Sequence, residues 1–273
     1  MNLPPEPTSI RATLDRGMAA FTAGERRIAQ AVLADYPYGA LVPIRQLAQR
    51  AGVSAPTITR FVAKIGCAGY QDFQRQLIGE LKERELSPVQ LKAGEAFERT
   101  AHALPGYAAR LAALIGRTAE GMNLRQFDEL CRLLAEPTRA VHLIGGRVTD
   151  SIARLLSAHL RQIRPRVRHL PRDPEHWPDA VLGLQRRDLL LVFDLRRYDP
   201  RLAELARLAA ARGATVVAVT DKWLSPVTVH ARMSFPLPTD IGTPWDTHVA
   251  LVAFVEAVIA RVAEACWPAT SGR

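Results

Sequence analysis

The 273-residue chain lacks the features that mark membrane, secreted and disulfide-linked proteins. No apolar run approaches the roughly 18 residues that a membrane-spanning helix needs, so we expect no membrane partner. The first residues contain three prolines and no apolar signal core, so secretion is not expected. Cysteine is scarce, odd in number and isolated, which favours a reduced cytoplasm over a disulfide framework. The cysteines are Cys67, Cys131 and Cys266.

Signals for catalysis and for common cofactors are also missing. The seven histidines are scattered, and they show neither metal-ligand spacing nor a neighbouring nucleophile. The pair Gly145-Gly146 lacks the G-x-G-x-x-G spacing of a dinucleotide site. We therefore predict no catalytic residue, no metal and no cofactor.

The net charge of +9 and the pI of about 10.1 favour an anionic partner. The basic excess is spread along the chain, because residues 1–90 hold 11 lysines and arginines against 8 acidic residues, and the remainder holds 25 against 19. Charge therefore supports DNA binding only weakly. The chain also contains one basic run, which we interpret as a solvated helix end and strand edge rather than as a DNA contact. Its members are Arg161, Arg164, Arg166, Arg168 and Arg172.

The strongest signal lies between Ile44 and Ile65, where the sequence predicts two short amphipathic helices joined by a glycine turn. Gly52 is expected to end the first helix with a positive φ, and the Ser54 hydroxyl is expected to cap the second. Apolar residues in each helix recur at i, i+3, i+4 and i+7, so they share one face. They are Ile44, Leu47, Ala48 and Ala51 in the first helix, and Ile58, Phe61, Val62 and Ile65 in the second.

The opposite face of the second helix presents hydroxyls and cations, which suits the major groove of DNA. We predict base-edge contacts from Thr57, Thr59 and Arg60, and we predict phosphate contacts from arginine and lysine. The alternative is an ordinary helical hairpin with a solvated outer face. The predicted DNA-binding residues are Arg45, Ser54, Pro56, Thr57, Thr59, Arg60 and Lys64.

Beyond Ala140, short apolar runs alternate with longer amphipathic segments. This alternation predicts a parallel sheet with helices on both faces. The expected strands are 141–144, 167–170, 188–193, 214–220 and 233–237. For the whole chain we predict a flexible arm at 1–20, an α-helical helix-turn-helix domain at 21–85, a linker at 86–96 and an α/β domain at 97–268.

Residues 21–81 resemble the N-terminal domain of the RpiR-type bacterial transcriptional regulators. Cys67 departs from this family's usual aromatic residue, which we expect to alter packing only. The resemblance implies a bacterial regulator that binds a double-stranded DNA operator. The landmarks are Thr22-x-x-Glu25-Arg26-x-Ile28-Ala29, Leu47-Ala48-x-x-Ala51-Gly52-Val53-Ser54, Thr57-Ile58-x-Arg60-Phe61, Lys64-Ile65-Gly66 and Gly69-Tyr70-x-Asp72-Phe73.

The second half resembles a sugar isomerase (SIS) domain, most strongly in the stretch Arg207 to Asp221 with Ser225-Pro226 beyond it. The resemblance implies phosphosugar binding that controls DNA binding. The family's loops after the first and middle strands are rich in glycine and hydroxyls, but here Arg147 and the segment Asp194–Asp199 replace them. The candidate effector residues are Gly145, Gly146, Arg147, Thr149, Ser151, Asp194, Arg196 and Arg197.

Three interpretations of these altered loops remain open. Arginines can hold a phosphosugar in place of hydroxyls, because guanidinium matches phosphate and carboxylate with two hydrogen bonds. The loops can instead bind another small acidic metabolite. In the third interpretation the arginines pair with Asp194 and Asp199, which leaves a ligand-free domain that only dimerises.

The sequence as a whole favours a cytoplasmic DNA-binding regulator with an α-helical helix-turn-helix domain and an α/β SIS-like effector domain. A homodimer or higher homo-oligomer is expected, since two reading helices on symmetric half-sites multiply specificity. A phosphosugar isomerase is the remote alternative, because it would need an intact phosphate loop and a placed general base. A constitutive DNA-binding dimer that responds to no metabolite is a further alternative.

Overall fold

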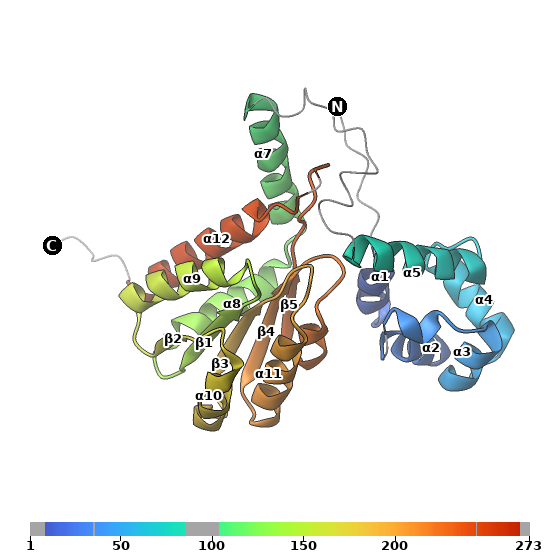
Figure 1. Ribbon diagram of the computed structural model, residues 1–273, viewed down its shortest axis with the longest axis horizontal. Coiled ribbons are helices and arrows are strands. Elements are labelled where there is room, and N and C mark those ends of the chain that lie inside the picture. Colours follow the sequence, from blue (N-terminus) through green and yellow to red (C-terminus); the bar gives the residue numbers. More distant parts are fainter. Residues whose placement is uncertain (1–8, 35, 86–103, 244, 268–273) are drawn as a thin grey trace. The chain divides into compact units, whose positions relative to one another are not determined.

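The computed structural model describes residues 9–34, 36–85, 104–243 and 245–267. The chain divides into two compact units, residues 1–87 and residues 88–273 (Figure 1). The predicted linker at 86–96 lies outside the described residues. Within the described part of the chain, no helix is long and apolar enough to span a membrane.

The first unit is helical, and its core is formed by apolar faces from five α-helices. Its largest fully buried side chains include Ile58, Phe61 and Phe73, and Phe61 meets Phe21 edge to face with ring centroids 5.2 Å apart. A capping box opens α2, because Thr22 accepts from the Glu25 N–H and Glu25 accepts from the Thr22 N–H. The elements are α1 (Ile10–Gly17), α2 (Ala23–Leu33), η1 (Tyr38–Ala40), α3 (Ile44–Ala51), α4 (Ala55–Lys64) and α5 (Tyr70–Glu85).

The predicted flexible arm at 1–20 is wrong for residues 10–17, which form α1. The Ser9 side chain caps this helix, and Ile10 and Leu14 are buried in the core. The Glu80 carboxylate of α5 fixes the start of α1, because the Ile10 N–H and the Tyr36 hydroxyl both donate to it. Tertiary contacts thus hold a helix that is too short to be stable alone.

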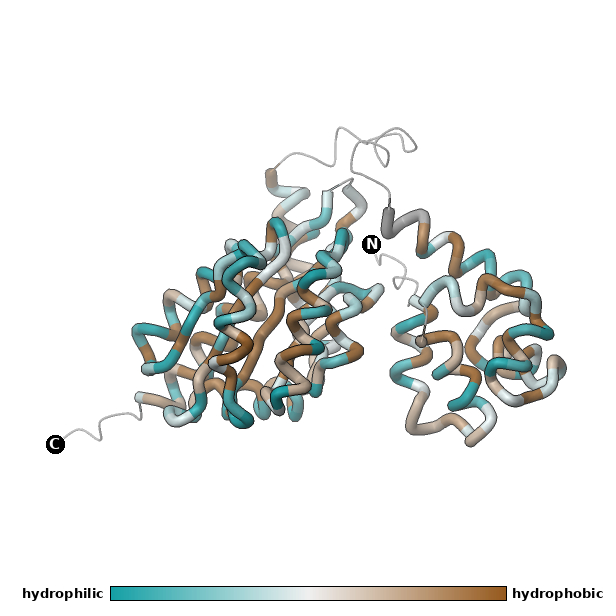
Figure 2. Tube along the Cα trace, turned by 60° about the horizontal axis from the view of Figure 1, so that its bottom comes forward, coloured by the Kyte–Doolittle hydropathy of each residue, from teal (hydrophilic) through white to brown (hydrophobic). Residues whose placement is uncertain are grey.

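The second unit contains a five-stranded parallel sheet in the order β2-β1-β3-β4-β5, as the alternating sequence pattern predicts. The central strands are buried on both faces, which explains their nearly continuous apolar sequence (Figure 2). The strands are β1 (Val141–Gly145), β2 (Val167–His169), β3 (Leu189–Phe193), β4 (Thr215–Thr220) and β5 (Met233–Pro236).

Helices cover both faces of this sheet (Figure 1). Alternate strand residues pack in the cores on opposite faces. On one face Leu191 and Val217 pack in a core that includes Phe254. On the other, Leu190 and Val216 pack with Leu205. The first face is covered by α7 (Leu104–Glu120), α8 (Leu124–Ala135), α9 (Asp150–Ile163) and α12 (Val249–Cys266). The second is covered by α10 (Trp177–Gly183) and α11 (Pro200–Ala211).

This arrangement confirms the predicted fold class of a helical unit and an α/β unit with a covered parallel sheet. Short elements were not predicted from the sequence. The helix α10 has seven residues, and the 3-10 helices η3 (Pro174–His176) and η4 (Pro226–His230) are shorter still. Segments of this length show too few turns for a helical period to appear in the sequence.

Candidate DNA-reading helix and effector-binding edge

The turn between α3 and α4 has the predicted geometry. Gly52 adopts a left-handed conformation with φ of 61°, and its N–H bonds to the last turn of α3. The Val53 N–H closes the turn on the Ala48 carbonyl at 3.0 Å. Pro56 lies in the first turn of α4, where the absence of its N–H removes no helical bond.

The predicted side-chain cap of Ser54 is wrong. The Ser54 Oγ makes no bond to the N-terminal backbone N–H groups of α4 and lies instead 2.8 Å from the Thr57 Oγ1. Both hydroxyls are therefore outside the buried core and linked to each other at the start of the helix.

Helix α4 buries one face and leaves a polar face in solvent. Ile58, Phe61 and Val62 are buried, as the periodicity predicts. Thr59 and Arg60 are exposed, and the Thr59 hydroxyl donates to the Ala55 carbonyl at 3.3 Å. Arg60 makes no hydrogen bond or ion pair with the described residues, and the same holds for the exposed Arg45 on α3.

Lys64 at the end of α4 is engaged in an ion pair. Its Nζ lies 2.8 Å from the Glu25 Oε2 and 5.7 Å from the centroid of the Phe21 ring. The lysine side chain remains 48% exposed. The Lys64 bond, together with the Thr22 bonds, lowers the pKa of Glu25. A phosphate contact from Lys64 would therefore compete with this carboxylate.

Two side chains of α5 hold the segment that leads into α3, a role that was not predicted for either of them. The Tyr70 hydroxyl and the Gln74 Nε2 each donate to the carbonyls of Ala40 and Val42. The Gly69-Tyr70 landmark was the available signal, but the partner carbonyls lie 28 to 34 positions earlier in the chain.

The first candidate effector loop follows β1 and is tightly bonded to β3. Gly145 must be glycine, because a Cβ at this position would lie 2.5 Å from the Asp150 nitrogen. The Gly146 N–H donates to the Thr149 Oγ1, and the Thr149 hydroxyl donates to the Phe193 carbonyl at 2.6 Å. Thr149 is buried, so its hydroxyl stabilises the loop.

Arg147 and Ser151 have different surroundings in this loop. Arg147 is exposed and has no hydrogen bond or ion pair with the described residues. Ser151 is also exposed, but its hydroxyl donates to the Val148 carbonyl at 2.8 Å. The neighbouring Asp150 is buried and paired, with its oxygens 2.9 Å from Arg154 and 2.8 Å from His169. Arg147 is thus the exposed cation at this turn.

The second candidate loop follows β3, and Asp194 at its start is buried rather than turned toward a ligand. It is 1% exposed and accepts from the Ser225 hydroxyl and, at 3.3 Å, from the Asp199 N–H. Burial raises its pKa to about 7, although these two bonds oppose the shift. The carboxylate ties its own loop to the loop after β4.

Asp221, which was not predicted as a site residue, joins the loop after β4 to the loop after β3. It directly follows β4, is fully buried, and accepts from the backbone N–H groups of Arg196 and Trp223 and from the Tyr198 hydroxyl. Burial raises its pKa despite these bonds. Asp194 and Asp221 therefore lock the two adjacent loops together.

The two arginines of the β3 loop differ in their exposure to solvent. Arg196 is 8% exposed, its guanidinium pairs with Asp246 at 2.9 Å, and its Cζ lies 5.4 Å from the centroid of the Trp223 ring. Arg197 adopts a positive φ of 65° and is exposed, with no hydrogen bond or ion pair to the described residues. Only Arg197 is thus presented to solvent.

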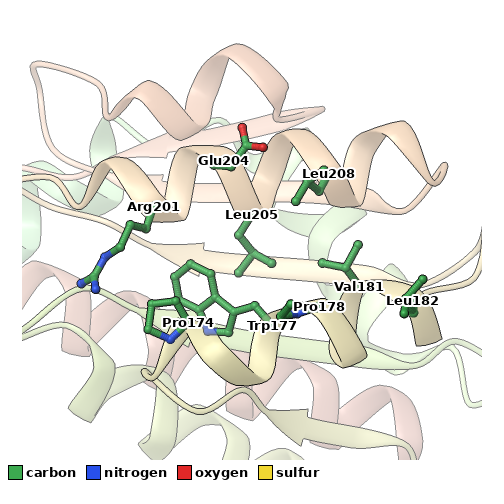
Figure 3. A pocket seen from close by; sticks show the side chains of 9 residues that line it. All are labelled: Pro174, Trp177, Pro178, Val181, Leu182, Arg201, Glu204, Leu205 and Leu208. Atoms are coloured by element: carbon green, nitrogen blue, oxygen red, sulfur yellow. The ribbon is translucent and has the colours of Figure 1, made fainter.

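An apolar pocket of about 500 Å³ lies between α10 and α11 (Figure 3). Trp177 and Leu205 point into it, and Arg201 and Glu204 lie at its border. These two charged side chains are held by Asp199 and Arg207 respectively. The pocket offers little to an anionic sugar, because its wall is apolar.

Two protein-family models match the chain. Residues 9–84 match the rpiR-family helix-turn-helix domain, and residues 134–261 match the SIS domain. With the turn geometry of α3 and α4, these matches define a DNA-binding transcriptional regulator. The chain belongs to the RpiR-type regulators, which join these two domains.

Two kinds of curated relatives match most of the chain. The chain is 25% identical over 247 residues to the HTH-type transcriptional regulator HexR of Pseudomonas aeruginosa, covering 87% of this chain and 83% of the relative. It is 26% identical over 227 residues to the bifunctional protein glk of Burkholderia thailandensis, covering 81% of this chain but 33% of that protein.

Solved structures share the fold. The NanR protein of Vibrio vulnificus, solved with ManNAc-6P, aligns with a TM-score of 0.51 at 17% identity and covers 93% of this chain and 91% of its own. The sugar isomerase domain of an RpiR transcription factor from Sphaerobacter thermophilus aligns with a TM-score of 0.53 at 19% identity, over 59% of this chain and 89% of its own.

Proposed function

We propose that this cytoplasmic regulator reads a duplex operator as a homodimer through the exposed face of α4. We further propose that its DNA affinity changes when the SIS-like unit binds a small anionic effector. The observation that carries the first part is Arg60, an exposed cation on a reading helix, with no bonded partner among the described residues. An unpaired guanidinium can bond two acceptors of guanine in the major groove.

The DNA proposal is tested with the full chain and a duplex selected from a random-sequence pool. Fluorescence anisotropy should show that Arg60→Ala weakens binding at least tenfold, as expected when one bidentate base contact is removed. Arg75→Ala is the matched control, because Arg75 is 76% exposed on α5 and its removal changes the charge equally. Equal affinity of Arg60→Ala and wild type would contradict the role of α4.

For the effector we propose a phosphosugar or a related acidic metabolite, bound at the carboxyl edge of the sheet. Arg147 and Arg197 support this, since both are exposed on loops joined by the Gly146–Phe193 backbone bond of 2.9 Å. Guanidinium groups bind phosphate and carboxylate with two bonds, and helix α9 begins beside Arg147. The SIS fold, shared with a regulator solved with ManNAc-6P, favours a phosphosugar.

A thermal-unfolding panel of sugar phosphates, free sugars and organic acids tests this effector proposal. A ligand of the folded state stabilises it by about 2.7 kcal/mol at a hundredfold excess over its dissociation constant. Arg147→Gln/Arg197→Gln should abolish the shift, whereas Arg117→Gln/Arg125→Gln should keep it, because these exposed arginines lie on α7 and α8. Equal shifts in both variants would contradict the assignment.

A ligand-free dimerising domain is the second candidate, and the internal pairing of Arg196 with Asp246 favours it. It predicts no thermal shift with any compound and no change of DNA affinity. We propose no isomerase activity, because Asp194 and Asp221 are buried and bonded to loop groups rather than open to a substrate. Turnover of a sugar phosphate by the full chain would overturn this assignment.

A further inference from the structure

Arginine precedes every strand of the parallel sheet. Because the strands are parallel, the residues before them lie at one edge, opposite the effector-binding loops. Neighbouring strands lie about 4.8 Å apart, so an edge of five strands extends ~20 Å. The arginines are Arg139 before β1, Arg164 and Arg166 before β2, Arg186 and Arg187 before β3, Arg212 before β4 and Arg232 before β5.

Several of these side chains have a structural role that leaves their charge intact. Arg164 is buried and donates to carbonyls of Leu134 and Arg139. Arg212 donates to the Leu182 carbonyl at 2.8 Å, near the end of α10. The carbonyl ends of helices are negatively polarised, so cations are favoured there. A carbonyl carries no net charge, and these bonds do not neutralise the guanidinium groups.

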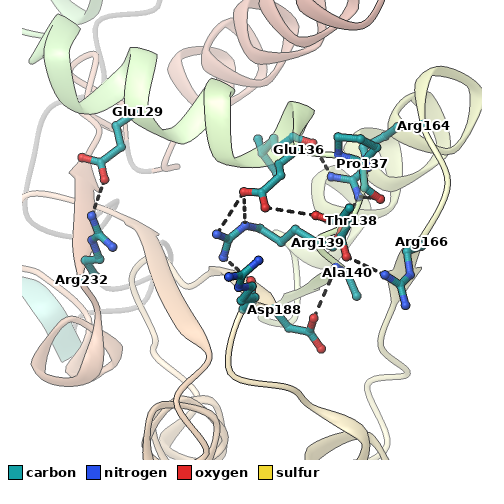
Figure 4. Close-up of polar contacts among 12 residues, drawn as sticks. Glu129, Glu136, Pro137, Thr138, Arg139, Ala140, Arg164, Arg166, Asp188 and Arg232 are labelled. Atoms are coloured by element: carbon teal, nitrogen blue, oxygen red, sulfur yellow. Dashed lines mark hydrogen bonds and ion pairs between the residues drawn. The ribbon is translucent and has the colours of Figure 1, made fainter.

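Carboxylates at this edge compensate only part of the positive charge (Figure 4). Arg139 pairs with Glu136 at 3.2 Å, and Arg232 pairs with Glu129. Asp188 is 6% exposed and is occupied by the backbone N–H groups of Ala140 and Gln185. Its oxygen also lies 3.7 Å from the buried His142.

Arg186 and Arg187 stand apart from the other members of the row. Both side chains are exposed, and neither makes a hydrogen bond or ion pair within the described part of the chain. Hydrogen bonding and helix capping therefore do not account for the two guanidinium groups, although the Arg186 stem packs beside Gly213 and Arg187 helps to lower the pKa of Glu136. The neighbouring exposed loop residues are polar or small, whereas Leu182 at the end of α10, whose carbonyl accepts from Arg212, is an exposed large apolar residue. The loop residues are Pro137, Thr138, Pro165, Arg166 and Gln185.

We propose that this arginine edge is a second duplex-DNA contact that binds phosphates without reading base sequence. The inference rests on the DNA binding already assigned to this family member. A line of guanidinium groups whose charge is only partly compensated suits a phosphate backbone, which carries regularly spaced negative charge. A protein partner fits less well, because protein interfaces place an apolar centre inside a polar rim.

The test measures how the DNA affinity of the full chain depends on salt from 50 to 200 mM, using a selected duplex extended by ~20 base pairs on each side. Arg186→Gln/Arg187→Gln should lower the slope of log affinity against log salt by about one for each phosphate that is no longer neutralised. Base preference should stay unchanged. The control Arg117→Gln/Arg125→Gln removes the same charge from α7 and α8 and should keep the wild-type slope.

Equal slopes for the edge variant and the control would overturn the proposal. Binding to poly-L-glutamate would be measured in the same way. If the edge variant lost this binding while its DNA slope stayed unchanged, the proposal would also be overturned, since an acidic polypeptide would then be the partner. Arg60→Ala, measured in parallel, separates this edge from the reading helix. It should change base preference and leave the contribution of Arg186 and Arg187 to the slope intact.

Discussion

Arg60 and Arg196 have the same side chain in opposite surroundings. Arg60 lies on a helix whose other face is buried, and it has no partner among the described residues. Arg196 lies in a loop at the carboxyl edge of the sheet, stacked near Trp223 and paired with Asp246. Residue type alone therefore does not decide whether an arginine can bind a ligand, because the bonding capacity left unused by the surrounding residues differs between the two.

The largest effect is expected from the buried half of α4. Phe61→Ala should destabilise the first unit by about 3–5 kcal/mol, because it leaves a cavity against Phe21. Thr59→Ala, on the exposed half, should stay within about 0.5 kcal/mol of wild type. Urea unfolding followed by circular dichroism measures both. A cost below about 1 kcal/mol for Phe61→Ala would contradict the buried face.

Asp194 should make stability depend on pH. Burial raises its pKa to about 7, so the folded chain keeps a proton that the unfolded chain releases near its ordinary value of 3.8. Its contribution to stability therefore falls as pH rises from about 4 to about 7. Each pKa unit corresponds to about 1.4 kcal/mol, so the stability difference between wild type and Asp194→Asn should change by ~3 kcal/mol across this range.

Chemical unfolding of both proteins at several pH values measures this difference. The comparison with Asp194→Asn cancels the titration of groups that the two proteins share. A stability difference that stays constant between pH 4 and pH 8 would show that the Asp194 carboxyl is not buried as described.

The Arg196 pair should be more important for stability than an exposed pair. Asp246→Asn removes the carboxylate charge that pairs with the 8% exposed guanidinium, which should cost about 2 kcal/mol. Glu264→Gln breaks the exposed pair with Arg261 and should cost less than about 0.5 kcal/mol. Thermal unfolding compares them, and equal costs would mean that Arg196 is accessible to solvent.

The smallest effect concerns Lys64. Glu25→Gln removes the charge that holds this lysine, while an amide oxygen can still cap the Thr22 N–H. DNA affinity should rise by about threefold at low salt and the gain should shrink at high salt, as for an exposed ion pair. Anisotropy measurements at two salt concentrations test this. A fall in affinity would indicate that Glu25 positions Lys64 for DNA.

Local patterns made helices α3 and α4 and the turn between them predictable from sequence. The buried residues Ile58, Phe61 and Val62 recur at helical spacing in α4, and Gly52 ends α3 in the left-handed conformation that its position indicates. Helix α1 was missed because its anchor is Glu80, 70 positions along the chain from Ile10. A distant partner leaves no mark on a local pattern.

The position of the candidate effector site was predictable from sequence, but the hydrogen bonds and ion pairs of its side chains were not. The apolar strands placed Arg147 and Arg197 at the carboxyl edge of the sheet, where the structure presents both to solvent. Arg196 pairs with Asp246, which lies 50 positions later in a loop without periodic sequence. The ties made by Asp194 and Asp221 likewise join loops that are separate in the sequence.

The role of Arg60 in reading DNA is tested most directly by the sequence preference itself. Wild type and Arg60→Ala would each be used to select duplexes from one random pool, and the recovered sites compared position by position. We expect preference to relax at one base pair of each half-site and to persist elsewhere, since the substitution removes one bidentate base contact. Identical recovered sites for the two proteins would contradict the assignment of α4 as the reading helix.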